Sequence, residues 1–320
     1  MSGRRVLIAG GAGFIGSHLC ELFLRTGDTV ICLDNMATGD SRNVAGLMGR
    51  ERFETLPIDV CDVTEERVDL VLHLASAASP VHYRRLSIET LLANSVGTQR
   101  LLELARANNC PFIYFSTSEA YGDPLVHPQR EDYWGNVNPI GPRACYDEGK
   151  RFGEALTMEY HRRYGLTTTI LRLFNTYGPR MALDDGRAIP AFFYAALRHE
   201  PIPIQGDGHQ TRSFCYIDDL VGAVQLVADA PHAGGIFNVG NPAEMTILEL
   251  AQAIGRLTGA PFRLQHLPPA EDDPARRCPD ITRIKAEYGW APRVPLEDGL
   301  ASTLADFAER MQIRLPEYSR

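Results

Sequence analysis

The sequence predicts an α/β protein built on a doubly wound parallel sheet, and three observations carry this prediction. Short apolar runs of strand length alternate with longer segments of helical periodicity, which is typical of successive βαβ units. The run at residues 68–75 is apolar almost throughout, as expected for a strand that helices cover on both faces. The first apolar run, at residues 6–9, leads directly into a glycine-rich turn and a second apolar segment.

The glycine-rich turn predicts a site for a dinucleotide. Gly10, Gly13 and Gly16 follow the first strand and open a helix. Glycine allows a tight turn and close backbone approach, and the N-terminus of the helix offers free N–H groups to a pyrophosphate. This spacing alone is weak evidence, but the next strand ends at Asp34, 18 residues after Gly16. A carboxylate there accepts both hydroxyls of an adenosine ribose and disfavours a 2′-phosphate, so we expect a Rossmann-type domain that binds NAD.

Length and composition are those of an ordinary globular protein. A chain of 320 residues can bury roughly 75% of the surface that its unfolded form exposes. Charged residues make up 22% of the chain and hydrophobic residues 44%, which are usual values for a folded domain. The formal net charge of −8 argues against a nucleic-acid partner, because phosphate binding needs a basic face.

Cysteine spacing and hydropathy indicate the compartment. The seven cysteines form no Cys-x-x-Cys pair, and no pair of histidines stands at metal spacing, so we expect reduced thiols and no metal site. No apolar run approaches the roughly 18 residues of a membrane span, and the first strand begins within about five residues of the N-terminus. We therefore expect a cytoplasmic protein without a membrane partner.

Periodicity and turn residues predict the remaining elements. The helix at residues 88–105 is expected to direct most of its apolar side chains toward a core, namely Leu91, Leu92, Val96, Leu101, Leu102 and Leu104. Further strands are expected at residues 30–33, 53–58, 112–115, 168–173, 202–204, 212–216 and 236–239, further helices at residues 143–150 and beyond, 190–198, 218–228, 247–257, 281–288 and 296–311, and polar loops at residues 35–48 and 123–142. A capping box, Thr246 with Glu249, opens one of these helices.

The βα alternation becomes less regular beyond Glu200. We therefore expect an NAD-binding domain at residues 1–174 and a smaller α/β lobe at residues 175–320. This lobe would mainly bind the substrate, and some of its segments would return to the first domain.

A cluster of hydroxyl groups and a Tyr/Lys pair are the candidate chemical groups. Ser116, Thr117 and Ser118 follow the fifth strand, at the end where open α/β sheets bind ligands. Tyr146 and Lys150 are four positions apart, so on a helix their side chains share a face. A nearby ammonium favours the phenolate, which would bring the pKa of the tyrosine toward neutral and make it a base for an alcohol. An exposed pair without function is the alternative.

Together these motifs resemble those of the extended short-chain dehydrogenase/reductases that act on nucleotide sugars. The glycine turn between Gly10 and Gly16 and the spacing Tyr146-x-x-x-Lys150 carry the resemblance. More narrowly, four segments resemble those of UDP-glucuronate decarboxylases. These segments span residues 116–124, 131–135, 138–151 and 272–280, and the resemblance covers nearly the whole chain.

The resemblance implies a reaction. In this family, bound NAD⁺ oxidises C4 of UDP-glucuronate to a ketone that is β to the C6 carboxylate. Carbon dioxide then leaves with its electrons delocalised into the ketone, and protonation at C5 with reduction of C4 gives UDP-xylose. Ala77 and residues 84–86 depart from the usual pattern, which leaves open how much of the UDP-4-keto-pentose is released.

The resemblance also implies roles for individual side chains in catalysis. Tyr146 would be the base at the sugar O4, and Lys150 would tune it and hold the nicotinamide ribose. Thr117 would hydrogen-bond O4, while Ser118 and Glu119 would lie near the departing carboxylate.

The remaining assignments concern binding. Arg277 matches the arginine that faces the reacting sugar in this family, and neighbouring Arg276 is the alternative. We expect NAD to contact Gly10, Gly13, Phe14, Ile15, Gly16, Asp34, Asn35, Asp59, Val60, Leu74, Ala75, Asn94, Tyr146 and Lys150. We expect the UDP-sugar to contact Ser79, Tyr83, Glu119, Asn175, Arg180, Arg212 and Arg277.

Two other functions remain open. Sugar-nucleotide dehydratases carry Asp in the place of Ser118, and simple 4-epimerases usually lack an acid in the place of Glu119. A UDP-glucuronate 4-epimerase or a related nucleotide-sugar epimerase or dehydratase is the first alternative, and a non-catalytic NAD-binding sensor or scaffold is a remote one. Relatives usually dimerise through the Tyr/Lys helix and the helix before it, so we expect a homodimer. The sequence does not indicate the downstream pathway.

Overall fold

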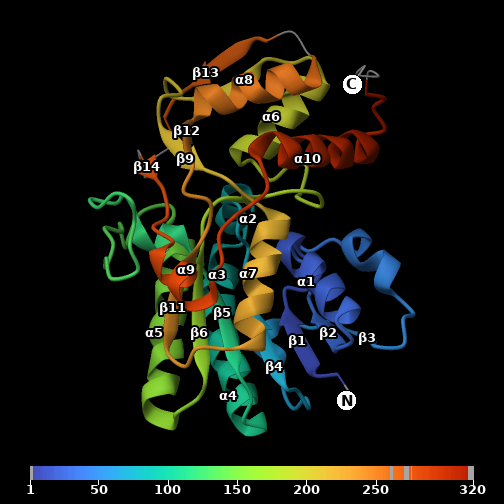
Figure 1. The fold of residues 1–320 in the computed structure, drawn as a ribbon, viewed down its shortest axis with the longest axis vertical. Coiled ribbons are helices and arrows are strands. Elements are labelled where there is room, and N and C mark those ends of the chain that lie inside the picture. The colour runs from blue at the N-terminus through green and yellow to red at the C-terminus, as the bar shows by residue number, and fades with distance from the viewer. Residues whose placement is uncertain (1–2, 260–261, 270–273, 275, 316–320) are drawn as a thin grey trace.

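A seven-stranded parallel sheet forms the centre of the molecule (Figure 1). The structure is a computed structural model that describes residues 3–259, 262–269, 274 and 276–315, so Asp272 and Asp273 of the fourth motif lie outside the described residues. The strand order is β11-β6-β5-β4-β1-β2-β3. These strands are β1 (Arg5–Ala9), β2 (Thr29–Leu33), β3 (Phe53–Leu56), β4 (Leu70–His73), β5 (Phe112–Thr117), β6 (Thr168–Leu173) and β11 (Gly235–Val239). The predicted doubly wound fold is confirmed, and the order reverses between β1 and β4, where such sheets bind ligands.

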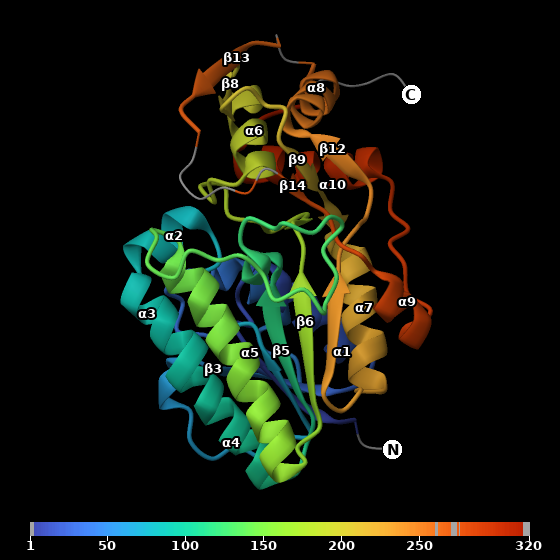
Figure 2. The same ribbon diagram turned by 90° about the vertical axis from the view of Figure 1, so that its left-hand side faces the viewer.

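Helices cover both faces of this sheet because its strands are apolar on both sides. In β1, Val6 and Ile8 belong to one hydrophobic cluster, and Leu7 and Ala9 belong to the other. Figure 2 shows α1 and α7 on one face, and α3, α4 and α5 on the opposite face. Their bounds are α1 (Phe14–Arg25), α7 (Ile217–Asp229), α3 (Ser87–Leu92), α4 (Thr98–Asn108) and α5 (Ala144–Tyr164).

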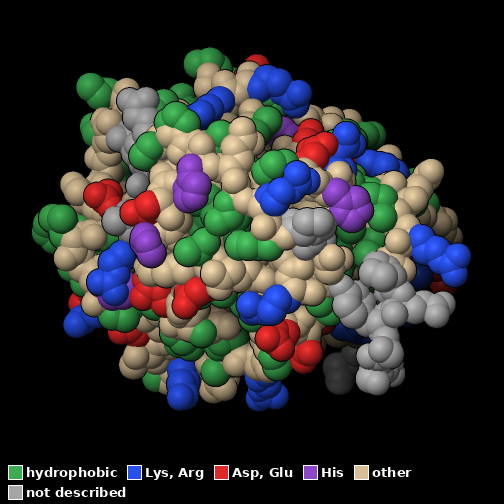
Figure 3. All heavy atoms as spheres, turned by 90° about the horizontal axis from the view of Figure 1, so that it is seen from above, with side chains coloured by type: hydrophobic (Ala, Val, Ile, Leu, Met, Phe, Trp, Pro, Cys, Tyr) green, Lys and Arg blue, Asp and Glu red, His purple; other side chains and the backbone are tan. Residues whose placement is uncertain are grey.

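A smaller lobe lies beyond the carboxyl ends of the strands (Figures 1 and 2). Its helices are α6 (Ala188–Leu197), α8 (Ile247–Thr258) and α10 (Leu296–Arg310), and its strands form a pair, β8 (Ile202–Gln205) with β13 (Leu264–Leu267), and a sheet of β12 (Glu244–Thr246), β9 (Thr211–Ser213) and β14 (Arg276–Arg277). Chain segments after residue 174 also return to the main sheet, since β11 pairs with β6 and α9 (Thr282–Tyr288) packs on β11. Acidic and basic side chains are interspersed over the lobe when it is viewed from above (Figure 3).

Several local predictions differ from the structure. The expected loop at residues 35–48 contains a 3-10 helix, η1 (Ser41–Leu47), and α2 (Pro80–Arg85) was not predicted. The expected strand at residues 212–216 is two strands, because β9 joins the three-stranded sheet while β10 (Cys215–Tyr216) pairs with β7 (Thr176–Tyr177). The capping box on α8 is confirmed by both of its hydrogen bonds. None of the described helices is long and apolar enough to cross a membrane.

The helix expected at residues 88–105 is interrupted, and part of its orientation was predicted wrongly. A π-helical turn, Ala93–Gly97, separates α3 from α4. Leu91, Leu92 and Val96 are 37–44% exposed, although we expected them mostly to face the core. Leu101 and Leu102 of α4 are fully buried, as expected. The reason is that α3 packs mainly against α5 and the π-helical turn, so part of its apolar side is left uncovered by the described part of the chain.

A glycine sets the distance between α5 and the sheet. A Cβ added to Gly153 would lie 2.1 Å from the hydroxyl oxygen of Tyr114, which is fully buried in β5. We predict that Gly153→Ala lowers the free energy of unfolding by about 1–3 kcal/mol, because overpacking at a buried contact outweighs the roughly 1 kcal/mol gain in helix propensity. In the control, Gly149→Ala on the same helix, the new Cβ would meet Asn94 at an ordinary 3.4 Å. Urea denaturation of both variants tests this, and equal stability would contradict it.

Candidate active site

The glycine turn fits a bound dinucleotide. Gly10 has a φ of +84°, and a Cβ there would lie 2.9 Å from both Leu74 C and Ala75 N, at the end of β4. A Cβ on Gly16 would lie 2.0 Å from the carbonyl oxygen of Gly10. The N-cap of α1 is Gly13, and among the described residues no side chain caps this helix. The first N–H groups of α1 are therefore left for an anion at the strand ends.

The acid at the end of β2 is fixed beside this turn. Asp34 accepts hydrogen bonds from the backbone N–H groups of Ala12 (3.0 Å) and Met36 (2.9 Å). Burial raises the pKa of Asp34, and these N–H donors oppose the rise. The side chain of Asn35 donates to Asp59, with 2.7 Å between the two atoms. The carboxylates at the ends of β2 and β3 thus lie on one side of the cleft, where an adenosine ribose is expected.

One cleft at the carboxyl ends of the strands brings together most of the predicted site residues. Those that line it are Gly10, Gly13, Phe14, Ile15, Gly16, Asp34, Asn35, Asp59, Val60, Leu74, Ala75, Ser79, Thr117, Ser118, Glu119, Tyr146, Lys150, Asn175, Arg180 and Arg277. Three predicted residues, Asn94, Tyr83 and Arg212, are not part of the wall.

Two of these three residues contact the wall through a neighbour. Asn94 is fully buried, and its amide donates to the hydroxyl of Ser76, which lines the cleft, over 2.8 Å. The ring of Tyr83 stacks on the ring of Tyr146 with 5.3 Å between centroids and 8° between planes. In the structure, Asn94 and Tyr83 therefore position cleft residues.

The arginines of β9 and β14 have different surroundings. Arg277 is buried, and its Nη1 lies 3.3 Å from Oε1 of Glu119. The side chain of Arg276 is 59% exposed and turns toward Glu244. Arg212 is aligned with Arg277 across the strand pair and donates to a backbone carbonyl. Of the two arginines that the sequence left open, Arg277 is the one that lines the cleft.

Burial dominates the protonation of the Tyr/Lys pair. Nζ of Lys150 donates to the carbonyl oxygen of Phe115 over 2.8 Å and lies 5.9 Å from the ring centroid of Tyr146. Burial lowers the pKa of Lys150 to about 7. Burial, followed by the negative charge of Glu119, raises the pKa of Tyr146, while the Thr117 hydroxyl opposes the rise. The expected lowering of this pKa by Lys150 is therefore wrong for the structure, because the phenol is buried with an acid nearby.

Glu119 is the centre of a buried charge cluster. Its carboxylate pairs with Arg143 and Arg277. Burial by itself would raise the pKa of Glu119, but the two arginines outweigh it and hold this pKa well below its usual range. Burial and the charge of Glu119 raise the pKa of neighbouring Asp147 to about 8. The electrostatics of this pair thus favour the ionised form of Glu119 and the protonated form of Asp147.

Our sequence assignment missed several charged residues of the site. Arg143 and Asp147 are both buried and flank Tyr146 in the highly specific segment at residues 138–151. Their spacing of four positions around a proposed base was a usable signal. Asp185 and Arg187 line the cleft itself and pair with each other, but they come from a loop whose sequence carries no motif.

Comparison with known proteins identifies the protein family of this chain. The profile of the NAD dependent epimerase/dehydratase family matches residues 6–240. The chain therefore belongs to this family, and its cofactor is NAD.

Curated relatives of this chain have a narrower activity than the family as a whole. Residues of this chain are 48% identical over 309 positions to "UDP-glucuronic acid decarboxylase 2" of Arabidopsis thaliana, covering 97% of this chain and 69% of that protein. The chain is also 46% identical over 309 positions to "UDP-glucuronic acid decarboxylase 1" of Danio rerio, and this match covers 97% of this chain and 74% of that protein. The resemblance to UDP-glucuronate decarboxylases is thus confirmed.

The fold comparison includes an enzyme of the alternative function. The structure of UDP-glucuronic acid 4-epimerase from Bacillus cereus, in complex with UDP-glucuronic acid and NAD, matches with a TM-score of 0.86. The match covers 96% of this chain and 99% of that chain, at 28% identity. The shared fold thus accommodates more than one reaction.

The burial of Lys150 predicts a pH-dependent stability. The lowered pKa of Lys150 corresponds to a destabilisation of the folded state by roughly 4–5 kcal/mol. This destabilisation is complete below about pH 7 and disappears as the pH rises to 10.5, the ordinary pKa of lysine. Replacing Lys150 leaves the Phe115 carbonyl without its donor, at a cost of roughly 1–3 kcal/mol. We therefore predict that Lys150→Met raises the free energy of unfolding by about 2 kcal/mol at pH 6.5.

Urea denaturation at pH 6.5 and pH 9.5 measures this effect. The gain in free energy of unfolding of Lys150→Met over wild type should shrink or reverse at pH 9.5. Lys285→Met, at the exposed second lysine of the chain, is the control and should change little. A destabilised Lys150→Met variant at pH 6.5 would contradict the prediction.

Proposed function

We propose that this protein is an NAD-dependent UDP-glucuronate decarboxylase that produces UDP-xylose. The observation that carries the proposal is the 46–48% identity, over 97% of the chain, to decarboxylases of a plant and a fish. Thr117, Glu119, Tyr146, Lys150 and Arg277 line one cleft next to the dinucleotide turn, and these are the residues to which the family resemblance assigns this reaction.

The chain holds its cofactor and substrate on opposite parts of the cleft. The turn around Gly10 and the N-terminus of α1 would bind the pyrophosphate of NAD, and Asp34 would bind the adenosine ribose. Bound NAD⁺ supplies the acceptor that takes a hydride from C4 of the sugar and later returns it. Residues 175–320 would mainly bind the UDP-sugar, with Asn175 and Arg180 at the cleft wall.

Side chains close to the end of β5 would transfer the proton of the sugar O4. Tyr146 would take the proton of O4 as C4 becomes a ketone, with Thr117 as hydrogen-bond partner of that oxygen. Lys150 would supply positive charge beneath this pair and contact the nicotinamide ribose. The ketone is β to the carboxylate, so the electrons of the breaking C5–C6 bond pass into the carbonyl. A proton then enters at C5, and Tyr146 returns its proton to O4 as C4 is reduced.

Glu119 and Arg277 would set the charge around the departing carboxylate. Arg277 is buried at the cleft wall, the side chain of Glu119 is 15% exposed there, and each is fixed by its ion pair with the other. Loss of neutral carbon dioxide would move the negative charge of the substrate carboxylate onto O4 of the enolate, away from the carboxylate of Glu119, which favours the step. The ion pair also keeps Arg277 at the sugar.

Product analysis tests the proposed reaction. We predict that incubation with UDP-glucuronate releases equal amounts of carbon dioxide and UDP-pentose, identified by mass spectrometry as UDP-xylose. Absorbance at 340 nm should return to its starting value, because a completed cycle restores NAD⁺. A lasting rise with UDP-4-keto-pentose would show release of the intermediate. UDP-galacturonate as the sole product would favour the 4-epimerase, and absence of any turnover would favour a non-catalytic protein.

The variant Glu119→Gln is the loss-of-function control for this assay. It keeps the shape of the side chain and removes the charge that holds Arg277 and Arg143. We expect kcat to fall by about tenfold or more, with a smaller change in KM. Glu159→Gln, at an exposed position of α5, should behave as wild type.

We also propose a homodimer formed through α3 and α5. Ile88, Leu91 and Leu92 of α3 and Phe152 of α5 are 62%, 37%, 44% and 51% exposed. The two helices pack against each other and lie side by side on one side of the molecule (Figure 2), and we infer that their exposed apolar side chains share one outer surface. Neighbouring exposed apolar side chains of this kind mark protein–protein contacts.

Solution mass tests the dimer. We predict a dimer for the wild-type protein and a monomer for Leu92→Asp by size-exclusion chromatography with light scattering, since the new charge would be buried at the contact. Leu226→Asp is the matched control, because Leu226 of α7 is 41% exposed on the opposite face. A monomeric wild-type protein, or a dimeric Leu92→Asp variant, would contradict the proposal.

The thiols support a cytoplasmic location. All seven cysteines are free in the structure, and five of them are buried. Free thiols persist in reducing compartments, so we infer that the protein works in the cytoplasm.

A further inference from the structure

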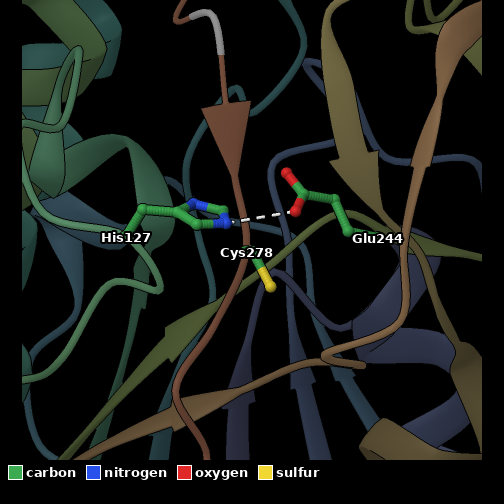
Figure 4. A group of neighbouring side chains, drawn as sticks. All are labelled: His127, Glu244 and Cys278. Atoms are coloured by element: carbon green, nitrogen blue, oxygen red, sulfur yellow. Dashed lines mark ion pairs between the residues drawn. The ribbon is translucent and has the colours of Figure 1, made fainter.

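Three potential metal ligands from distant parts of the sequence meet beside the three-stranded sheet. His127 belongs to the loop at residues 123–142, Glu244 begins β12, and Cys278 directly follows β14. Their ligand atoms all lie within 4.8 Å of one another. Figure 4 shows the imidazole and the carboxylate pointing toward each other, with the sulfur of Cys278 beside the line that joins them. None of the three residues lines the candidate active site.

The donor set suits zinc. Imidazole nitrogen, carboxylate oxygen and thiolate sulfur are the protein ligands of Zn²⁺. Nε2 of His127 lies 3.1 Å from Oε2 of Glu244. Zinc–ligand distances of about 2.0–2.3 Å separate neighbouring ligand atoms by roughly 3–4 Å, so the sulfur has to approach by only about 1 Å. Cys278 is buried, whereas the side chains of His127 and Glu244 are 26% and 20% exposed, which leaves an open side for water as the fourth ligand.

Hydrogen bonds from surrounding residues hold two of the three ligands, Glu244 and Cys278, in place. The hydroxyl of Thr211 donates to the second carboxylate oxygen of Glu244. Gln129, two residues after His127, is fully buried and bonded to Cys278 in two ways. Its side-chain oxygen accepts from the N–H of Cys278 (2.8 Å), and its own N–H donates to the carbonyl oxygen of Cys278 (2.9 Å). Such partners orient metal ligands in known sites.

One cation competes for the same carboxylate. Nη2 of Arg276 lies 3.7 Å from Oε2 of Glu244. The side chain of Arg276 is 59% exposed, so it can turn into solvent when another cation binds.

We propose that His127, Glu244 and Cys278 form a Zn²⁺ site that clamps the loop at residues 123–142 and β12 to the end of β14. The proposal departs from the expectation of no metal, which rested on linear spacing. It does not depend on the proposed function. On binding, the sulfur of Cys278 exchanges its proton, which passes to solvent, for a bond to the metal. Because Arg277 precedes Cys278, an occupied site would restrain the strand that brings Arg277 to Glu119.

Cobalt substitution tests the site without reference to activity. We expect Co²⁺ added to the purified protein to produce a thiolate-to-cobalt charge-transfer band in the near ultraviolet and visible bands of tetrahedral cobalt, both removed by added Zn²⁺. Cys278→Ser should abolish the charge-transfer band. His127→Gln should weaken Co²⁺ binding by roughly tenfold or more. Cys61→Ser, which removes a half-buried cysteine outside the cluster, is the matched control and should keep the band.

Thermal unfolding provides the second measurement. Zn²⁺ should raise the Tm of wild type and of Cys61→Ser, and it should not raise the Tm of Cys278→Ser. No charge-transfer band at millimolar Co²⁺, or a band that persists in Cys278→Ser, would overturn the proposal. If circular dichroism shows that Cys278→Ser does not fold, Glu244→Gln replaces it, because its amide oxygen still accepts from Thr211. Unchanged Co²⁺ affinity in that variant would overturn the proposal.

Discussion

The ion pairs of Glu119 hold three separate parts of the molecule around one cleft. Glu119 follows β5 in the main sheet, Arg143 precedes α5, and Arg277 ends β14 in the smaller lobe. All three charges are screened from water, so each depends on its partners, and loss of one partner leaves an uncompensated buried charge that costs about 3–5 kcal/mol. The cleft therefore forms only when sheet, helix and lobe are assembled together.

The same burial sets the protonation states at the reacting end of the cleft. Tyr146 and Lys150 lie on one turn of α5, but water exclusion shifts both toward their neutral forms. The negative charge of Glu119 opposes phenolate formation as well. The positive charge of a bound nicotinamide would act in the other direction, which links base strength to cofactor binding.

Much of the fold follows from local sequence. The apolar strands, the capping box of Thr246 and Glu249, and the glycine turn at Gly10 each have a short-range physical cause, and each stands where it was expected. Local sequence could not assign Leu91 and Leu92 to a surface, because helical periodicity shows that a helix has an apolar side but not what covers that side. It also could not divide residues 212–216 between two sheets, since strand partners come from distant segments.

The sequence by itself determined the chemistry of the site: the NAD turn, the acid after the second strand, the Tyr/Lys spacing and the similarity to UDP-glucuronate decarboxylases. These features are local, and local backbone geometry places their atoms. The tertiary structure decided which of Arg276 and Arg277 enters the cleft, and that Arg143 and Asp147 lie beside Glu119 at its wall. It also decided that His127, Glu244 and Cys278 meet. The reason is that charge pairing, burial and the pKa values that follow from them depend on contacts between residues that are 24 to 158 positions apart, as Arg143 and Arg277 are from Glu119.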